Sequence, residues 1–174
     1  SIVATNVGNV WTAVYTMVSG DAQGAINYTI DFQDLAGNNS TPVNTNSVIV
    51  FDSIAPSTTN VSVVSGGLNP FLAKAFNQII ITILDSAAVQ VPTVIIMGHA
   101  ATVSSLGGNA YQATYTPNLT DSEGFVVYSI SLVDLAGNTY NSGNVTSGVT
   151  FDRTPPVFSN VSVTNSNPNP GYAK

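Results

Sequence analysis

The chain has 174 residues, only 7% of them charged, and its nine acidic and three basic side chains give a net charge of −6. Nucleic acids and anionic lipids are bound through clusters of Lys and Arg, so this composition excludes both as partners. There is no cysteine, which excludes disulfides and thiolate sites, and no apolar run reaches the roughly 18 residues that a membrane helix needs.

A fixed spacing of 100 residues organises the sequence. Asp-Leu-Ala-Gly-Asn at 34–38 recurs at 134–138, and Phe-Asp at 51–52 recurs at 151–152. Aligned without a gap, residues 1–74 and 101–174 share 28 identities in 74 positions. We therefore predict a tandem repeat with a period of 100 residues.

A unit of about 100 residues has the size of one β-sandwich domain. Residues 1–52 match the second half of this unit, residues 53–152 make one complete repeat, and residues 153–174 match the first strand of the next. The chain is therefore expected to be cut inside a domain at both ends.

Short apolar or alternating segments, separated by Gly, Pro, Asn and Asp about every ten residues, predict an all-β sandwich in the complete unit. The predicted strands lie near residues 58–64, 77–85, 92–97, 100–104, 109–116, 124–133 and 145–152. In the clearest strand, alternation places four apolar residues on the core face: Val126, Tyr128, Ile130 and Leu132. The earlier copy repeats this parity at Ile26, Tyr28, Ile30 and Phe32.

The segment 134–138 predicts the turn that follows strand 124–133. Gly137 suits a positive φ, and the Asp134 side chain can accept hydrogen bonds from the backbone of its own turn. A turn of this composition predicts an antiparallel connection to the last strand of the unit.

The order of short motifs over one period of the repeat is distinctive. It begins with Tyr-Ala-Lys, as found at 172–174, and continues with Pro-Thr-Val-Ile-Ile-Met-Gly-His, Ala-Thr-Tyr-Thr, Asp-Ser-Glu-Gly, Asp-Leu-Ala-Gly-Asn and Phe-Asp-Arg-Thr-Pro-Pro, as found between residues 92 and 156. This order resembles the bacterial Ig-like repeats of large cell-surface adhesins and related surface proteins of single-celled eukaryotes. The resemblance covers the whole chain. It implies tandem immunoglobulin-like β-sandwich domains in an extracellular rod at the cell surface, with calcium ions at the joints of some relatives.

The few carboxylates are expected to gather at one joint. If the strands alternate in direction, Asp85 and Asp134 close strands at the end of the complete unit where the chain enters. The preceding unit would bring Asp52 and Asp21 to the same place. Four carboxylates with Asn138 and backbone carbonyls would suit Ca²⁺, which takes six to eight oxygens. The alternative is that each Asp caps its own turn.

Seven Asn-x-Ser/Thr sequons suggest a glycosylated surface. They lie at Asn27, Asn38, Asn39, Asn60, Asn118, Asn144 and Asn160.

No pattern in the sequence predicts an enzyme. His99 is the only histidine and follows Gly98 in a predicted turn. Asp121 and Glu123 have the residue types of a glycosidase pair, but the earlier copy of the repeat has Gln in place of Glu123. The repeat position shared by Trp11 and Tyr111 is either a core aromatic or a sugar-stacking one.

These observations favour a structural or adhesive role, as a rod-forming spacer or building block of a surface adhesin or filamentous appendage. Pro56, Pro155 and Pro156 would stiffen the linkers between units. The expected partners are neighbouring repeats and lateral copies of the chain in a filament. The alternative is a carbohydrate- or protein-binding module, which would need an exposed aromatic or apolar patch to bind surface glycans or proteins.

Overall fold

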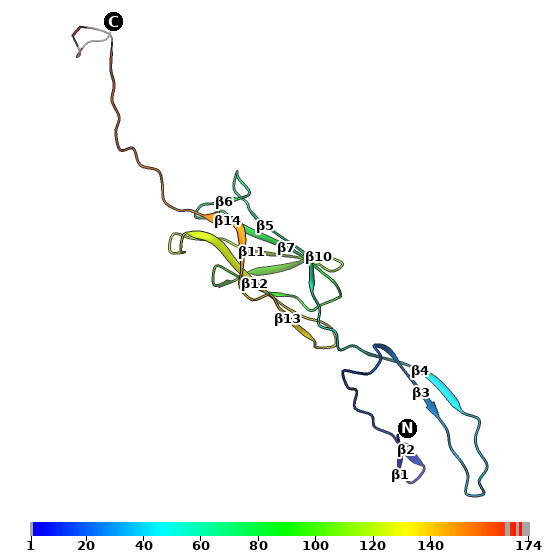
Figure 1. The fold of residues 1–174 in the computed structure, drawn as a ribbon. Coiled ribbons are helices and arrows are strands. Elements are labelled where there is room, and N and C mark those ends of the chain that lie inside the picture. Colours follow the sequence, from blue (N-terminus) through cyan, green and yellow to red (C-terminus); the bar gives the residue numbers. More distant parts are fainter. Residues whose placement is uncertain (1, 166–167, 170, 172–174) are drawn as a thin grey trace.

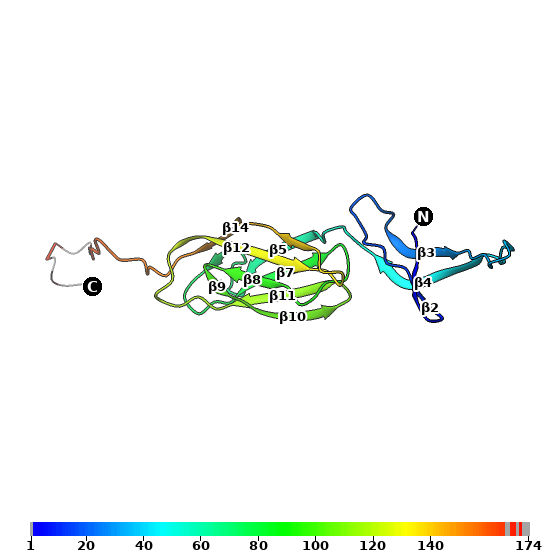
Figure 2. The same ribbon diagram turned by 90° about the horizontal axis from the view of Figure 1, so that it is seen from below.

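The protein is described by a computed structural model that covers residues 2–165, 168–169 and 171. These residues form an elongated, all-β molecule without a helix, so no helix here could cross a membrane. A β-sandwich occupies the centre, two hairpins lie at its N-terminal side, and an extended segment leaves the opposite end (Figures 1 and 2).

The first sheet of the sandwich has four antiparallel strands in the order β10-β11-β7-β5. β7 is an inner strand paired with both β11 and β5, and its side chains alternate strictly, with Ile79, Ile81 and Ile83 fully buried on one face. The bounds are β5 Thr58–Ser65, β7 Ile79–Asp85, β10 Thr102–Gly107 and β11 Ala110–Tyr115.

The second sheet has the order β6-β14-β12-β8-β9, and β13 also pairs with β12. Its long strand β12 carries the predicted core face, and Val126, Tyr128, Ile130 and Leu132 are all buried. That prediction is confirmed. The bounds are β6 Leu72–Ala73, β8 Thr93–Ile96, β9 His99–Ala100, β12 Gly124–Val133, β13 Thr139–Asn141 and β14 Val145–Phe151.

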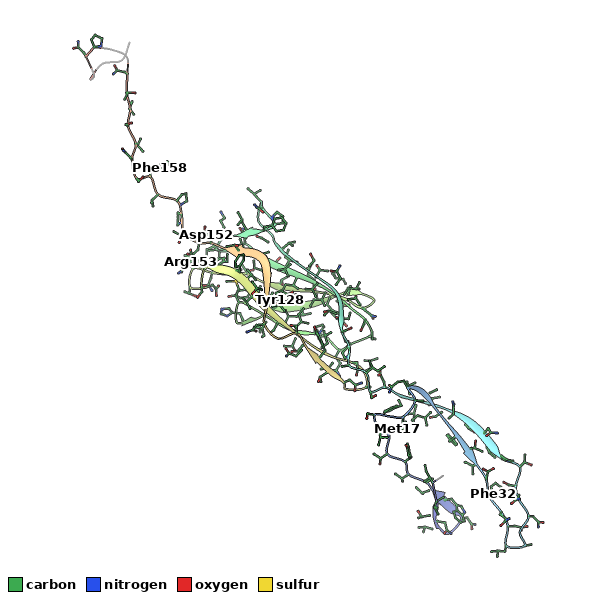
Figure 3. All side chains as sticks on the ribbon, viewed as in Figure 1. Met17, Phe32, Tyr128, Asp152, Arg153 and Phe158 are labelled. Atoms are coloured by element: carbon green, nitrogen blue, oxygen red, sulfur yellow. The ribbon has the colours of Figure 1, made fainter. Side chains whose placement is uncertain are left out.

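The two sheets enclose one apolar core, in which Phe151 is the largest fully buried side chain. Alternation puts every second residue of β7 and β12 inside, so the sheets bury these faces against each other. Tyr128 lies in the middle of the sandwich (Figure 3).

We name the two ends of the sandwich by the direction of the chain. The proximal pole is the end where β5 begins, and it carries the connections 86–92 and 134–138. The distal pole is the end where β14 finishes, and it carries the connections 66–78 and 116–123. The antiparallel pairing of β5, β7 and β11 fixes this arrangement.

Residues 2–52 form two separate hairpins instead of a sandwich. Tyr28 on β3 is 47% exposed, whereas its counterpart Tyr128 is 8% exposed. Both side chains belong to the predicted core face, but β3 and β4 have no second sheet opposite them, so that face stays open to solvent. The bounds are β1 Thr5–Val7, β2 Val10–Thr12, β3 Gly24–Ile30 and β4 Val43–Phe51.

Residues 153–165 contain no strand, although their sequence matches that of β5. β5 is held by β7, and the sequence has no second segment like β7 with which residues 158–164 could pair. Phe158 is exposed and lies away from the sandwich (Figure 3). The rest of the predicted strand segment, at residues 166–167, 170 and 172–174, lies outside the described residues.

Candidate functional site

The turn 134–138 at the proximal pole is built around one carboxylate. Asp134 Oδ1 accepts the backbone N–H groups of Ala136 and Asn138 at 2.9 and 2.8 Å, and Asn138 Nδ2 donates to Oδ2 at 2.9 Å. Gly137 has a φ of 97°, which favours glycine. Burial raises the pKa of Asp134, but the bonds from Asn138, Gly137 and Ala136 outweigh it and hold the pKa below its ordinary value of 3.8. Asp134 thus acts as a turn cap.

Asn138 also reaches the segment that precedes the sandwich. Its Nδ2 donates a second hydrogen bond, to the backbone carbonyl of Asp52 at 3.1 Å. Asp52 directly follows β4, and its own Oδ1 accepts the N–H of Ile54 at 2.9 Å. The structure therefore brings together Asp52, Asp134 and Asn138, three of the five residues predicted to share a joint.

Asp85 is buried at the same pole, and its carboxylate has no hydrogen-bond partner in the described part of the chain. It ends β7 on the inward-facing parity of Ile81 and Ile83, so its side chain continues the core face and is only 4% exposed. Neither carboxylate oxygen has a hydrogen-bond partner among the described residues. Burial raises the pKa of Asp85 above 3.8, because a charge without partners is costly inside a protein.

Asp21 is bonded within its own segment. It accepts the Tyr15 hydroxyl at 2.8 and 3.1 Å and the N–H of Val18 at 2.8 Å. Across the described residues, no group of three or more His, Cys, Asp or Glu side chains could hold a metal ion. Asp21 and Asp134 thus cap their own turns, while the carboxylate oxygens of Asp85 have no hydrogen-bond partner in the part of the chain that the structure describes.

At the distal pole, Glu123 holds the segment that leaves the sandwich. Its Oε1 accepts the N–H of Arg153 at 3.0 Å and the Thr154 hydroxyl at 2.6 Å. The Arg153 guanidinium also donates to the carbonyl of Leu119. The Thr154 hydroxyl, followed by the Arg153 N–H, lowers the pKa of Glu123 below 4.5. Figure 3 shows Asp152 and Arg153 where the chain departs.

The same clamp occurs 100 residues earlier, with glutamine in the role of glutamate. Gln23 Oε1 accepts the N–H of Ser53 at 2.8 Å, and Gln23 Nε2 donates to the Ser53 hydroxyl at 2.8 Å. From the sequence, the exchange of Glu123 for Gln23 at this position argues only against a glycosidase. The structure gives the position a role that either side chain can perform, because both present an acceptor oxygen.

Asp121 joins the distal turn to the hairpin of β8 and β9. It accepts the N–H of Asn118 at 2.7 Å, the Tyr115 hydroxyl at 3.0 and 3.2 Å, and lies 2.9 Å from His99 Nε2. His99 stacks on the Tyr115 ring with centroids 4.8 Å apart. His99 was predicted to lie in a turn, but it is the first residue of β9 and directly follows the turn of Met97 and Gly98. Its carboxylate partner was not predicted, because the two residues lie 22 positions apart.

The aromatic repeat position has two outcomes. Tyr111 is buried in the core, and its hydroxyl donates to the Val89 carbonyl at 3.0 Å, so the core interpretation is confirmed for this copy. Trp11 is 67% exposed, because β1 and β2 pair only with each other.

The sequon asparagines lie at the surface. Asn118 is half-buried, and its Oδ1 accepts the N–H and hydroxyl of Thr120 at 2.7 and 2.6 Å. Asn38 Nδ2 donates to Asp34 Oδ2 at 2.8 Å. The exposed members of the set are Asn27, Asn38, Asn39, Asn60, Asn144 and Asn160.

The chain matches no model of a known protein family, and a search of curated proteins also finds no match. The geometry of the two poles is therefore the basis on which a function can be proposed.

Proposed function

We propose that this chain is part of an extracellular rod of tandem immunoglobulin-like units, in a structural or adhesive protein of the cell surface. The observation that carries the proposal is that the chain is hydrogen-bonded to the sandwich both where it enters and where it leaves. Where the chain enters the sandwich, at the proximal pole, Asn138 donates to the Asp52 carbonyl. Where it leaves, at the distal pole, Glu123 accepts the Arg153 N–H. Forces along the chain would therefore pass through the sandwich from end to end.

The strand arrangement supports an immunoglobulin-like unit. Its four-stranded sheet joins the first, second, fourth and fifth predicted strands, and the other sheet joins the third, sixth and seventh. This division is the one found in the constant type of immunoglobulin domain. The parallel pairing of β6 with β14 adds a short edge to the second sheet.

Matching contacts at the 100-residue spacing support a tandem array. Asp34 receives the same bonds from residues 36 and 38 that Asp134 receives from 136 and 138. Tyr15 and Tyr115 each donate to the Asp six residues later. The paired Gln23 and Glu123 clamps follow the same rule.

The linker is short and bonded on both sides, which supports a stiff joint. Between β4 and β5 only residues 52–57 intervene, and Pro56 within them is buried. Ser57 N–H donates to the Ser86 hydroxyl at 3.1 Å, and Ser86 N–H donates to the Ser57 carbonyl at 2.8 Å. Bending such a linker would break several hydrogen bonds at once.

A binding module is the second candidate, because apolar side chains are exposed near the distal pole. Phe71, Phe76 and Phe125 are each more than half exposed. An exposed aromatic group can stack on a sugar or insert into a protein partner. Titration of the chain with surface glycans, followed by amide chemical shifts, separates the candidates. Shifts confined to these aromatics would favour the binding module.

Calcium at the joint remains part of the proposal and now centres on Asp85. Its two unpartnered oxygens are the donors a hard cation would use, while both oxygens of Asp134 are occupied by the turn. Calorimetry with Ca²⁺ on the wild type and on Asp85→Asn tests this directly. Heat of binding in the wild type alone would support the site, and no heat in either would remove calcium from the proposal.

The rod itself is tested by small-angle scattering on the chain lengthened after Lys174 by a second copy of residues 75–152. This addition continues the period of 100 and completes the unit that begins at residue 153. An extended particle whose length grows by one sandwich supports the rod. Two units folded back on each other, or a second unit that does not fold, would contradict it. Repeating the measurement with a chelator shows whether stiffness depends on calcium.

A further inference from the structure

The distal pole carries an open hollow beside the point where the chain leaves. It has a volume of about 650 Å³ and is formed by the connection between β5 and β7, together with Asp152. Leu68 and Leu72 line it and expose most of their surface, and Lys74 stands at the same hollow. Exposed leucines grouped around a concavity are typical of a contact surface.

The opposite pole carries an exposed leucine on a rigid turn. Leu135 is 77% exposed in a turn whose backbone is fixed by the Asp134 cap. Leu35 occupies the same position in the equally capped turn 34–38 and is fully exposed. Both copies therefore present an apolar side chain to water from a turn that cannot readily fold it inward.

The bond from Asn138 to Asp52 relates the two poles to each other. It places the turn 134–138 beside the residue that follows the last strand of the preceding unit. The counterpart of Asp52 is Asp152, and Asp152 lines the hollow. Applying the joint seen at Asp52 to the joint at Asp152 puts the turn of a following unit next to the hollow.

We propose that the hollow is the socket for the Asp-Leu-Ala-Gly-Asn turn of the following unit, whose leucine packs against Leu68 and Leu72. The joint would then combine one hydrogen bond to the Asp152 carbonyl with one buried leucine side chain from the turn of the following unit. This inference rests on the proposed tandem array. It also explains why Leu135 stays exposed here, because residues 1–52 include no counterpart of the connection 66–78.

The occupant is a following unit in the same chain, and the argument for it is continuity with the joint already present. Arg153 and Thr154 are fixed to Glu123 at this pole, so the next unit starts within a few residues of the hollow. A lateral partner would have no such attachment. Tethering by a short linker makes the intramolecular contact strongly favoured over an intermolecular one.

Disulfide trapping in the lengthened chain described above provides the test, since the natural sequence has no cysteine. One variant combines Leu72→Cys with Leu135→Cys in the added copy. The control combines Leu119→Cys with the same added cysteine, because Leu119 is exposed at the same pole but does not line the hollow. We expect an intramolecular disulfide under mild oxidation in the first variant, at a yield on the order of tenfold above the control.

Three results would overturn the inference. They are equal yields in the two variants, no disulfide in either, or a disulfide formed mainly between two chains. Folding of the added unit, followed by its amide spectrum, separates these results from failure of the tandem array itself. If the added unit does not fold, the proposed function is wrong. If it folds but the disulfide does not form, only the proposed contact between the turn and the hollow is wrong.

A second measurement avoids any new covalent bond. Leu135→Ser in the added copy is expected to loosen the second joint. Residual dipolar couplings would then show that the two sandwiches no longer keep one fixed relative orientation. The same substitution in the first copy should leave the first joint unchanged, because no socket faces it. Equal effects in the two copies would contradict the socket.

Discussion

Asn138 Nδ2 donates to both the Asp134 carboxylate, at 2.9 Å, and the Asp52 carbonyl, at 3.1 Å. One amide group therefore closes the turn between β12 and β13 and attaches that turn to the preceding segment. The counterpart Asn38 makes the first of these bonds, to Asp34 at 2.8 Å. The cap is thus a local feature of the sequence, and the joint is an additional use of the same side chain.

Removing this amide is expected to loosen the joint as well as the turn. Asn138→Ala should lower the free energy of unfolding of the sandwich by about 1 kcal/mol, since two hydrogen bonds are lost at a partly exposed position. Chemical denaturation measures this change. Asn38→Ala is the matched control, because it removes only a cap within the β3–β4 hairpin. If both variants left the sandwich equally stable, the Asn138 bonds would carry no net stability.

Asp85 should destabilise the sandwich when it is charged. Burial raises its pKa, so the folded state holds the proton more tightly than the unfolded state. The stability from this proton is fully present below pH 3.8 and is lost as the pH rises through the raised pKa. Asp85→Asn should therefore raise the free energy of unfolding near pH 7 by about 1–3 kcal/mol, with a smaller gain near pH 4.

Urea unfolding across this pH range measures the effect. Asp31→Asn is the control, because Asp31 is exposed in the β3–β4 hairpin and its substitution should leave the sandwich unchanged at every pH. A gain from Asp85→Asn that does not vary with pH would show that proton binding at Asp85 is not its source. Adding Ca²⁺ to the wild type should remove the gain if the cation pairs with this carboxylate.

Strand positions were predictable because alternation and turn residues are local. β12 has the predicted bounds, and β5 extends its predicted strand by one residue. The short strands β6 and β13 were not predicted, and β9 overlaps the predicted strand 100–104 only at Ala100. Each has two or three residues, so its pairing depends on a neighbouring strand more than on its own composition.

The site was harder to predict, because its contacts join residues far apart in the sequence. The cap at Asp134 follows from the five residues of its own turn and was among the interpretations considered. The clamp of Glu123 on Arg153 spans 30 residues, and the contact of His99 with Asp121 spans 22. The inward direction of Asp85 was visible in the alternation of β7, since it shares the parity of Ile83.

Phe76 is held in a strained backbone conformation. Its φ is 69°, a region that a bulky residue rarely adopts, and its side chain is 69% exposed. Its N–H donates to the Pro117 carbonyl at 2.7 Å, which keeps the backbone in place. Phe76→Gly should therefore raise the free energy of unfolding by about 0.5–1 kcal/mol, because glycine adopts this φ without strain.

Thermal melting of two variants checks this assignment. Phe71→Gly is the matched control, since Phe71 has a similar exposure and does not have a positive φ. This control should lose stability, because glycine gains freedom in the unfolded chain without relieving strain. A loss of equal size at Phe76 would mean that its conformation is not strained.

Glu123 is expected to control the departing segment through its acceptor oxygen more than through its charge. Glu123→Ala should speed hydrogen exchange of the Arg153 amide by on the order of tenfold, since that N–H loses its acceptor. Glu123→Gln should retain most of the protection, as Gln23 does for Ser53 in the earlier copy. Equal exchange in the alanine and glutamine variants would show that the carboxylate charge is required.

Asp121 should give the sandwich the opposite pH response to that of Asp85. Burial raises its pKa, but the bonds from Asn118, Tyr115 and His99 outweigh burial and bring the pKa below 3.8. A lowered pKa contributes stability that is present above the unfolded value and is lost as the pH falls through the folded one. The wild type should therefore lose stability as the pH drops below about 4.

Asp121→Asn tests this assignment. The variant should be less stable than the wild type by about 1.5–3 kcal/mol near pH 7, because three donors lose a charged acceptor. Its melting temperature should also fall less steeply in acid. Asp85→Asn, measured alongside, should gain stability near pH 7 where Asp121→Asn loses it. If both substitutions changed the free energy of unfolding in the same direction, the contrast between a hydrogen-bonded Asp121 and an unbonded Asp85 would be wrong.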